Sequence, residues 1–263
     1  LNDEEKENIF FVPTIIGKYK PNDIESIFKN SKENMIFKQD FLKIHDYVSS
    51  IIHLIKLSII NDSKVDFQKF DIYPLIKEDL INNQYNNSTL QGLLNFNFFK
   101  RLSKEKIQLR LAINWFENQP IDKGFNLGVN TFYPDAEHFG YKGYLISEDY
   151  NFYINPTGFE LNNQLIPKKI LVVGKGLVES SKKYYKGLSV NTAPAFRFSR
   201  VWNNKITKQK RGNKKIILVA LPIAFKESIE IVKLIFDISN EKKINCFFNF
   251  KPHPSMDFYK IKQ

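Results

Sequence analysis

The sequence predicts an α/β protein with two domains, the second of them incomplete. Three observations favour this class. Short β-branched strands alternate with helical patterns, polar or glycine-rich segments follow several strands directly, and 263 residues suffice for two domains. We expect the first domain to cover residues 1–160 and the second residues 161–263, with an irregular loop over Asp149–Pro167 at their junction.

The first third of the chain reads as a strand followed by helices. The apolar run Ile9–Ile16 has a proline near its middle, which favours an edge or bulged strand. A short helix is expected over Ile24–Lys29. Apolar residues recur at three- and four-residue spacing over Gln39–Ile60, which predicts the clearest helix. His45 and His53 lie eight residues apart on it, too far for one metal ion, and we interpret them as packed or solvent-facing.

A strand and its following loop dominate the middle of the chain. Helical patterns are expected over Tyr73–Ile81 and from Ser88 or Thr89 to Phe99. Apolar residues then alternate with polar or small ones over Ile107–Trp115, which predicts a strand. A polar and glycine-rich stretch follows, up to an extended segment over Tyr141–Ile146. Polar side chains directly after a strand lie where α/β proteins place their sites.

The second half predicts a parallel, doubly wound sheet. Three strands and two helices alternate, over Lys169–Gly174, Leu177–Tyr185, Ile216–Leu221, Lys226–Ile238 and Asn245–Phe250. Leu188–Trp202 is expected to be a long connection. Helices of about ten residues between short strands are typical of parallel sheets with crossover connections. The chain ends shortly after the last strand pattern, so we expect a fragment of a longer polypeptide, with a trimmed complete domain as the alternative.

Composition restricts the partners. A formal charge of +11 and a pI of about 9.4 suit nucleic acid, anionic lipid or phosphorylated substrates, although codon bias in an AT-rich genome would also give this composition. The basic run Lys205–Lys215 has no interleaved aromatics, so we interpret it as a loop rather than a nucleic-acid surface. The single Cys246 permits no internal disulfide and fits a reducing compartment. The sequence contains no apolar run of about 18 residues, so we expect no membrane span.

Two clusters of polar residues in the first half could carry chemistry. Glu117 follows the predicted central strand together with Asn118 and Gln119, where a carboxylate can act as a general base or orient a sugar. A loop-bracing role for Glu117 is the alternative. Asp135 lies close in sequence to Glu137 and His138, but this spacing matches no strong metal motif, so each of them could equally brace a loop.

Three features of the second half suit a phosphate. Two prolines flank His253 after the last predicted strand, and this rigidity presents the imidazole and Lys251 at the sheet edge. Ser228 lies in the first turn of a helix, where a cap and a phosphate site are both possible interpretations. The turn from Gly174 to Gly176 follows a strand and precedes a helix, but it is neither a dinucleotide fingerprint nor a P-loop.

These motifs carry a resemblance to a known family. A strand ending in His253-Pro254, within the second of two Rossmann-like domains, resembles bacterial GT-B glycosyltransferases that use CMP-activated acidic sugars, such as Kdo transferases of capsule and lipopolysaccharide biosynthesis and certain sialyltransferases. The stretch WFENQPIDKGFN, followed by FGYKGY, is similar to surface-polysaccharide biosynthesis proteins of this group. The resemblance covers Phe98–Ser255.

The resemblance implies a role for each candidate residue. His253 and Pro254 would hold the donor phosphate with help from Lys251. Three more residues would line the nucleotide pocket: Ser228, Gly174 and Gly176. Four residues would lie on the acceptor side: Glu117, Asn118, Gln119 and Tyr141. Glu117 or Asp135 would supply the catalytic carboxylate, between which the sequence does not decide.

We therefore expect a cytoplasmic, GT-B-type glycosyltransferase that needs no cofactor or metal beyond its donor. The donor would be a CMP-linked sugar such as Kdo, the acceptor a glycan or lipid-linked glycan, and the anionic inner membrane a candidate attachment surface. We do not expect nucleic acid as a partner. The alternatives are a CDP-glycerol-type glycerophosphotransferase and a non-catalytic carbohydrate- or protein-binding module of a larger assembly enzyme.

Overall fold

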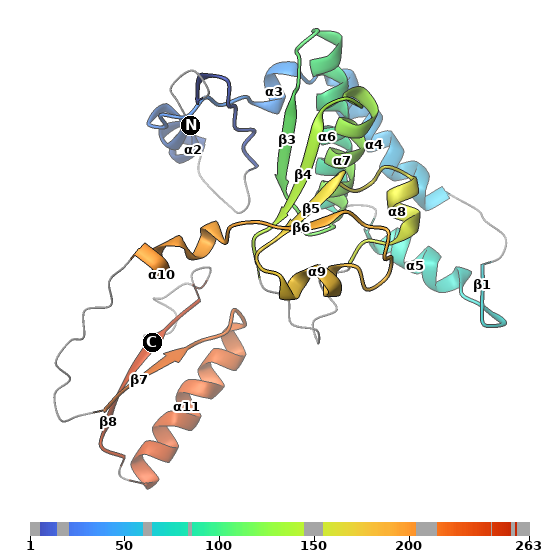
Figure 1. Ribbon diagram of the computed structural model, residues 1–263. Coiled ribbons are helices and arrows are strands. Elements are labelled where there is room, and N and C mark those ends of the chain that lie inside the picture. The colour runs from blue at the N-terminus through green and yellow to red at the C-terminus, as the bar shows by residue number, and fades with distance from the viewer. Residues whose placement is uncertain are drawn as a thin grey trace. The chain divides into compact units, whose positions relative to one another are not determined.

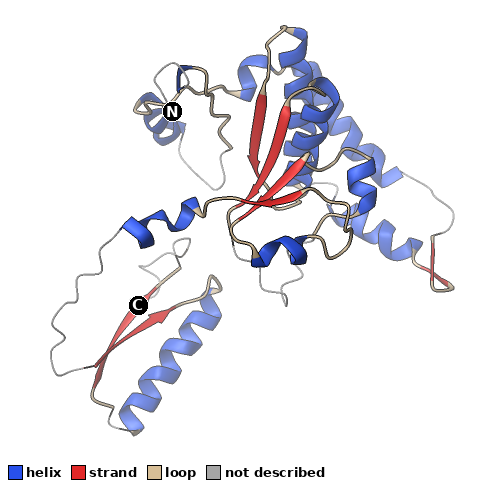
Figure 2. Ribbon diagram, viewed as in Figure 1, coloured by secondary structure: helices blue, strands red, loops and turns tan. Residues whose placement is uncertain are grey.

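The structure, a computed structural model, is mixed α/β and contains a four-stranded parallel sheet (Figures 1 and 2). It describes residues 6–14, 21–59, 65–83, 86–144, 155–203, 215–242, 244–253 and 256. The chain divides into two compact units, unit 1 (Leu1–Val201) and unit 2 (Trp202–Gln263). The boundary expected between residues 160 and 161 lies inside unit 1, because strands from either side of it pair in one sheet.

Unit 1 contains most of the secondary structure. Its helices are α2 (Pro21–Lys29), α3 (Lys38–Phe41), α4 (Ile44–Ile59), α5 (Tyr73–Asn83), α6 (Asn87–Lys104), α7 (Pro120–Phe132), α8 (Gly158–Asn162) and α9 (Gly176–Ser181), followed by the 3₁₀ turn η1 (Phe196–Phe198) and α10 (Ser199–Asn203). Its strands are β1 (Asp66–Phe67) and β2 (Phe70–Asp71), which form a hairpin, and β3 (Leu111–Trp115), β4 (Glu137–Lys142), β5 (Lys169–Val172) and β6 (Val190–Thr192).

The main sheet has the order β3-β4-β5-β6, and each strand is parallel to its neighbour. Two buried apolar clusters lie on one of its faces, between the strands and helices α6 to α9. The opposite face carries half-exposed aromatic and aliphatic side chains such as Ile113, Trp115 and Tyr141. A doubly wound sheet has helices on both faces, whereas the helices just named cover one face here.

The alternating pattern of β3 suggests that its large apolar side chains are buried, but they lie on the exposed face of the strand. Its apolar residues Leu111, Ile113 and Trp115 point to the open face, and the small residue Ala112 points to the helices. The strand also begins later than the alternation at Ile107 predicts, because Lys106 has a positive φ of 59° and residues 107–110 are irregular. The alternation therefore identified the strand, and the packing of α7 decided which face became the core.

Helices α6 and α7 approach each other closely through glycines. A Cβ added to Gly124 would overlap the backbone carbonyl of Gly92, and one added to Gly92 would overlap the carbonyl oxygen of Pro120. A Cβ at Gly128 would lie 2.9 Å from the ring of Phe99. The two backbones can come this near only because no side chain separates them. The start of α7 is thereby fixed against α6.

An ion pair joins α4 to α6. Arg101 binds both carboxylate oxygens of Asp46, with N–O distances of 2.7 and 2.8 Å, and the Asp46 side chain also accepts the backbone N–H of Lys43. Burial alone would raise the pKa of Asp46, but these hydrogen bonds hold it below the ordinary value. The helix expected over residues 39–60 is accordingly divided into α3 and α4, since the Asp46 side chain caps a new helix start.

Beyond the end of α10, the described residues of unit 2 form a βαβ element made of β7 (Lys215–Ala220), α11 (Phe225–Glu241) and β8 (Cys246–Lys251). The expected continuous sheet over residues 169–250 is not formed, because β5 pairs with β4 and β6 in unit 1 whereas β7 and β8 pair with each other. The short strand β6 lies within Leu188–Trp202, which the sequence suggested to be a connection. The basic run Lys205–Lys215 lies outside the described residues except for its last member.

We predict that Gly124→Ala strongly destabilises the protein, by about 2–4 kcal/mol, because the added methyl group must push α6 from α7. Urea denaturation followed by circular dichroism measures this change. Gly176→Ala is the matched control, since a Cβ there meets no atom within 4 Å. Equal stability of the two variants would contradict the proposed helix contact.

Candidate functional site

The carboxyl ends of the four parallel strands bring several candidate residues to one edge. Glu117 follows β3, Tyr144 follows β4, the turn at Gly174 follows β5 and Pro194 follows β6. Ligands of open α/β sheets bind at this edge. Among the described residues it is therefore the first place to look for a site in unit 1.

The loop between β3 and α7 is held in a single shape. Asp122 accepts the backbone N–H groups of Glu117 and Gln119 at 2.9 and 3.1 Å and so caps α7 from within its first turn. Asn118 has a left-handed φ of 57° and is buried. Burial raises the pKa of Asp122 to about 6, although the N–H groups that it accepts act in the opposite direction. The N–H groups of the first turn of α7 are also engaged, that of Ile121 by Ser88 Oγ and those of Asp122 and Lys123 by the carbonyl of Gln119, so the start of α7 is not an anion site.

The carboxylate of Glu117 is clamped by two neighbours. Trp115 Nε1 donates to one oxygen at 2.7 Å, and Gln119 Nε2 donates to the other at 2.8 Å. This geometry fixes the indole ring of Trp115. These hydrogen bonds agree with the alternative hypothesis that Glu117 braces the loop. They also hold its carboxylate in a defined position at the sheet edge.

A second set of contacts anchors the loop to α8. Asn118 Nδ2 donates to Glu160 Oε1 at 3.2 Å, and the same carboxylate pairs with Lys123 Nζ at 2.6 Å. Glu160 also accepts the N–H and the hydroxyl of Thr157 in a capping box. Burial of Glu160 would raise its pKa, but Lys123, the N–H of Thr157 and Asn118 together lower it. Asn118 is thus a support for the loop and faces α8.

A pocket of about 390 Å³ lies on the open face of the sheet beside this loop. Its lining is mostly aromatic and aliphatic and comprises Ile113, Asn114, Trp115, Tyr141, Leu171, Ala193, Pro194 and Phe196. The rings of Trp115 and Tyr141 meet edge to face at 5.9 Å. An apolar, aromatic pocket with few polar groups is the usual form of a small-ligand site.

Tyr141 supplies a polar group to the pocket. The Tyr141 hydroxyl donates to the carbonyl of Pro194 at 2.9 Å and accepts the N–H of Phe196 at 3.2 Å. It therefore pins the segment after β6 across the open face and leaves its ring to line the pocket. Asn114 Oδ1 is buried and has no hydrogen-bond partner within the described residues, but Asn114 is in phase with Ala112, so its side chain lies on the helix side of β3 and not in the pocket.

Lys142 is a buried base at the end of β4. Its side chain lies 1% exposed, with Nζ 3.1 Å from Asn155 Oδ1 and 5.8 Å from the centroid of the Phe116 ring. Among the described ion pairs none involves Lys142. Burial lowers its pKa to about 8.

The predicted cluster around Asp135 is dispersed. Asp135 is exposed in the turn before β4, at the amino edge of the sheet, and six residues of β4 at about 3.3 Å each separate it from the carboxyl edge and Glu117. His138 is fully buried and lies 3.0 Å from Asn130 Oδ1, and burial lowers its pKa to about 4. No group of three potential metal-binding side chains occurs in the described part of the chain.

The expected nucleotide-binding residues fall into both units. Gly174 (φ 145°) and Gly176 belong to the turn after β5 in unit 1, and both have open space where a side chain would project. In unit 2, Ser228 is fully buried and its hydroxyl donates to the carbonyl of Pro222 at 3.0 Å, so it braces the start of α11.

The His-Pro element comprises Lys251, His253 and Pro254, and the structure describes the first two of them. Lys251 is the exposed last residue of β8, and its carbonyl accepts the N–H of Leu221 at 2.9 Å. His253 is half-buried, and its carbonyl accepts the N–H of Met256 at 2.9 Å. Pro254 lies outside the described residues. Lys251 thus ends β8 and His253 follows it, so both lie at the carboxyl end of the strand, where the sequence placed them.

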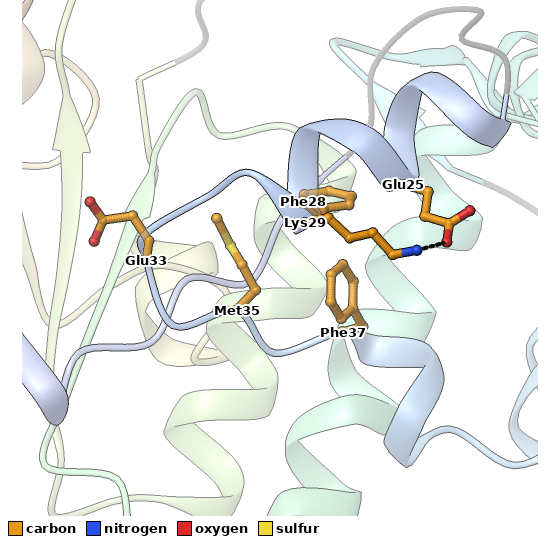
Figure 3. A pocket seen from close by; sticks show the side chains of 6 residues that line it. All are labelled: Glu25, Phe28, Lys29, Glu33, Met35 and Phe37. Carbon is orange, nitrogen blue, oxygen red and sulfur yellow. Dashed lines mark ion pairs between the residues drawn. The ribbon is translucent and has the colours of Figure 1, made fainter.

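A second pocket, of about 350 Å³, lies beside α2 (Figure 3). Phe28 and Phe37 meet edge to face at 4.8 Å, and Lys29 pairs with Glu25 at 2.6 Å on the helix surface. None of the residues predicted to be functional lines it. The carboxyl edge of the sheet is therefore the better candidate.

Sequence reasoning missed Asp122, Lys142 and Phe196. Asp122 had a detectable signal, because an acidic residue three positions after Gln119, with a proline between them, is typical of a helix start. The burial of Lys142 and the approach of Phe196 to Tyr141 (5.9 Å between ring centroids) arise from tertiary packing and leave no local pattern.

Comparison with models of protein families, with curated proteins and with solved structures gave no match for this chain. Within the described ranges, no helix is both long and apolar enough to cross a membrane. What the protein does is therefore inferred from its own residues and fold.

We predict that Asp122→Ala lowers the free energy of unfolding by about 1–2 kcal/mol at neutral pH, because two loop N–H groups lose their acceptor. Chemical denaturation measures this loss. Asp135→Ala is the control and should change stability by less than about 0.5 kcal/mol, since Asp135 is exposed. A loss for Asp135→Ala as large as that for Asp122→Ala would argue against the cap.

Lys142 predicts an unusual pH dependence. Its pKa is about 8 in the folded protein and 10.5 ordinarily, so the unfolded chain binds more protons between these values and stability rises with pH from about 8 to 10.5. Lys142→Met should remove this rise. It should also raise stability at pH 7 by about 1–3 kcal/mol, because the buried charge is lost together with one hydrogen bond. Denaturation curves at pH 7, 8, 9 and 10 test both statements, and a variant that keeps the wild-type rise would refute them.

Proposed function

We propose that the protein is a glycosyltransferase of GT-B type that binds its acceptor glycan in the aromatic pocket of unit 1. The observation that carries the proposal is the combination of this pocket with the clamped carboxylate of Glu117 at the carboxyl edge of a parallel sheet. The resemblance of WFENQPIDKGFN and of the His-Pro element to CMP-sugar-dependent transferases supports the same class.

The pocket suits a sugar for physical reasons. A pyranose ring has an apolar face that packs on aromatic rings, and polar hydroxyls at its edge. Trp115 and Tyr141 offer rings, and the Tyr141 hydroxyl offers a polar group. A volume of about 390 Å³ accommodates one or two sugar units.

Glu117 is proposed to act on the acceptor. A carboxylate held by two donors stays in place while a substrate hydroxyl approaches, and it can accept the proton of that hydroxyl as the new glycosidic bond forms. Asp135 is not proposed as its partner, because it lies at the opposite edge of the sheet.

Unit 2 is proposed to hold the donor. Lys251 and His253 lie at the carboxyl end of β8 and can donate hydrogen bonds to a phosphate, which stabilises the nucleotide as a leaving group. Gly174 and Gly176 belong to unit 1 and are not included in this proposed donor site. Ser228 is not proposed to contact the nucleotide, because its hydroxyl is buried against Pro222.

A non-catalytic carbohydrate-binding module is the second candidate. The hydrogen bonds of Glu117 to Trp115 and Gln119 favour it, since both carboxylate oxygens are already engaged and the indole is positioned as a stacking surface. Such a module would bind glycan through the same pocket and would not bind a nucleotide.

We predict that CMP, but not UDP, raises the melting temperature of the protein by a few degrees at saturating concentration, which corresponds to about 2–3 kcal/mol at a hundredfold excess over Kd. His253→Ala should abolish this shift, and Lys233→Ala, an exposed lysine on α11, should retain it. Stabilisation by CDP alone would favour a glycerophosphotransferase. Absence of any nucleotide effect, together with glycan binding that Trp115→Ala weakens, would favour the binding module.

A further inference from the structure

Three aromatic rings line the pocket on the open face of the main sheet. Trp115 of β3 and Tyr141 of β4 are register partners, and their rings meet edge to face at 5.9 Å. The ring of Phe196, from the segment after β6, lies 5.9 Å from that of Tyr141 at an interplanar angle of 51°. Because the rings are inclined to one another, their electron-rich faces point in different directions. Rings arranged in this way can contact one ligand from more than one side.

Two of these rings are held in place by the protein itself. A Cβ added to Gly143 would lie 2.4 Å from Cζ3 of Trp115 and 2.5 Å from Cε1 of Tyr141, so both rings pack directly on the backbone at this glycine. Trp115 Nε1 also donates to Glu117, and the Tyr141 hydroxyl donates to the carbonyl of Pro194. Rings that are already ordered lose little side-chain entropy when a ligand binds.

The pocket has no spare hydrogen-bond donor on its described side chains. Trp115 Nε1 and the Tyr141 hydroxyl are the donors that its lining side chains carry on the open face, and both already donate within the protein. No lysine, arginine or histidine is among the described residues that line it. A phosphate or carboxylate needs donors or a cation to replace its water shell. The pocket therefore disfavours anionic ligands.

A carboxylate touches the edge of the aromatic cluster. Glu117 Oε1 lies 2.7 Å from Trp115 Nε1, so its charge is in direct contact with an indole ring that lines the pocket. This hydrogen bond polarises the indole, and the negative charge acts over the short distance between the ring edge and the pocket. Ring faces and carboxylate together attract a positive charge.

The same face of the sheet already holds an ammonium group on an aromatic ring. Lys169 Nζ of β5 lies 5.3 Å from the centroid of its register partner Phe139, and neither residue lines the pocket. Two residues further along the strands, Tyr141 is paired with Leu171 instead. Among the described cation–π contacts none involves Tyr141. The pocket thus has the aromatic half of such a contact, and a ligand can supply the cation.

We propose that the pocket binds a sugar with a positively charged amino group. The apolar face of the sugar would pack on Trp115. The ammonium group would lie against the faces of Tyr141 and Phe196, with the carboxylate of Glu117 nearby, and the hydroxyls would remain in water at the open side. This inference rests on the proposed function, because it takes the pocket to be the acceptor site, and it names the acceptor as an amino sugar with a free amine.

Isothermal titration calorimetry with matched disaccharides tests the proposal. The probes are the β1,4-linked disaccharide of glucosamine and the same disaccharide with both amines acetylated, at pH 6, where a free amine is protonated. The wild-type protein should bind the free-amine form about fivefold more tightly, as one exposed cation–π contact predicts. Glu117→Gln keeps the size of the side chain and removes its charge. It should reduce this preference and leave the affinity for the acetylated form unchanged.

A second variant removes one ring of the pocket. Phe196→Leu should weaken binding of the free-amine disaccharide about fivefold, because the ring is lost while the backbone N–H that Tyr141 accepts remains. Phe159→Leu is the matched control, since Phe159 is 71% exposed on α8 and does not line the pocket. Equal binding of the two disaccharides would overturn this proposal and leave the proposed function standing. Binding of neither would overturn both this proposal and the acceptor role of the pocket, whereas the response to CMP tests the donor site separately.

Discussion

The close contact between α6 and α7 is the constraint on which the rest of unit 1 depends. Gly92 packs against the carbonyl of Pro120 and Gly124 packs against Gly92, so the first turn of α7 has one available position. That turn carries Asp122, which in turn sets the loop before it. The clamp on Glu117 and the orientation of Trp115 are thus consequences of backbone packing between two helices.

The main sheet retains buried polar groups that cost stability. Lys142 is buried with one hydrogen bond, and His138 Nε2 and Asn114 Oδ1 have no partner within the described residues. An apolar residue of similar size at each of these positions would give a more stable fold. All three side chains lie on the helix-covered face of the sheet, in phase with Ala112, and not on the open face that carries the aromatic pocket.

The sequence predicted where helices and strands occur better than it predicted which of their sides are buried. Alternation identified β3 and three- and four-residue spacing identified α4, because both periods are local properties of the backbone. Neither pattern revealed that the large apolar side chains of β3 and α4 would be exposed to solvent. In α4 the buried pair between Asp46 and Arg101 decides the rotation, and these residues are 55 positions apart. In β3 the closeness of α7 admits only Ala112 and other small groups on the inner face.

The order of the main sheet has a consequence for synthesis of the chain. β3, β4, β5 and β6 lie side by side in the order in which they leave the ribosome. Each strand can therefore pair with the one made just before it, and no later segment has to be inserted between strands already formed. A nascent chain that has reached α7 and β4 already contains the glycine contact, the cap and the first strand pair. The loop that carries Glu117 can thus be completed before β5 is translated.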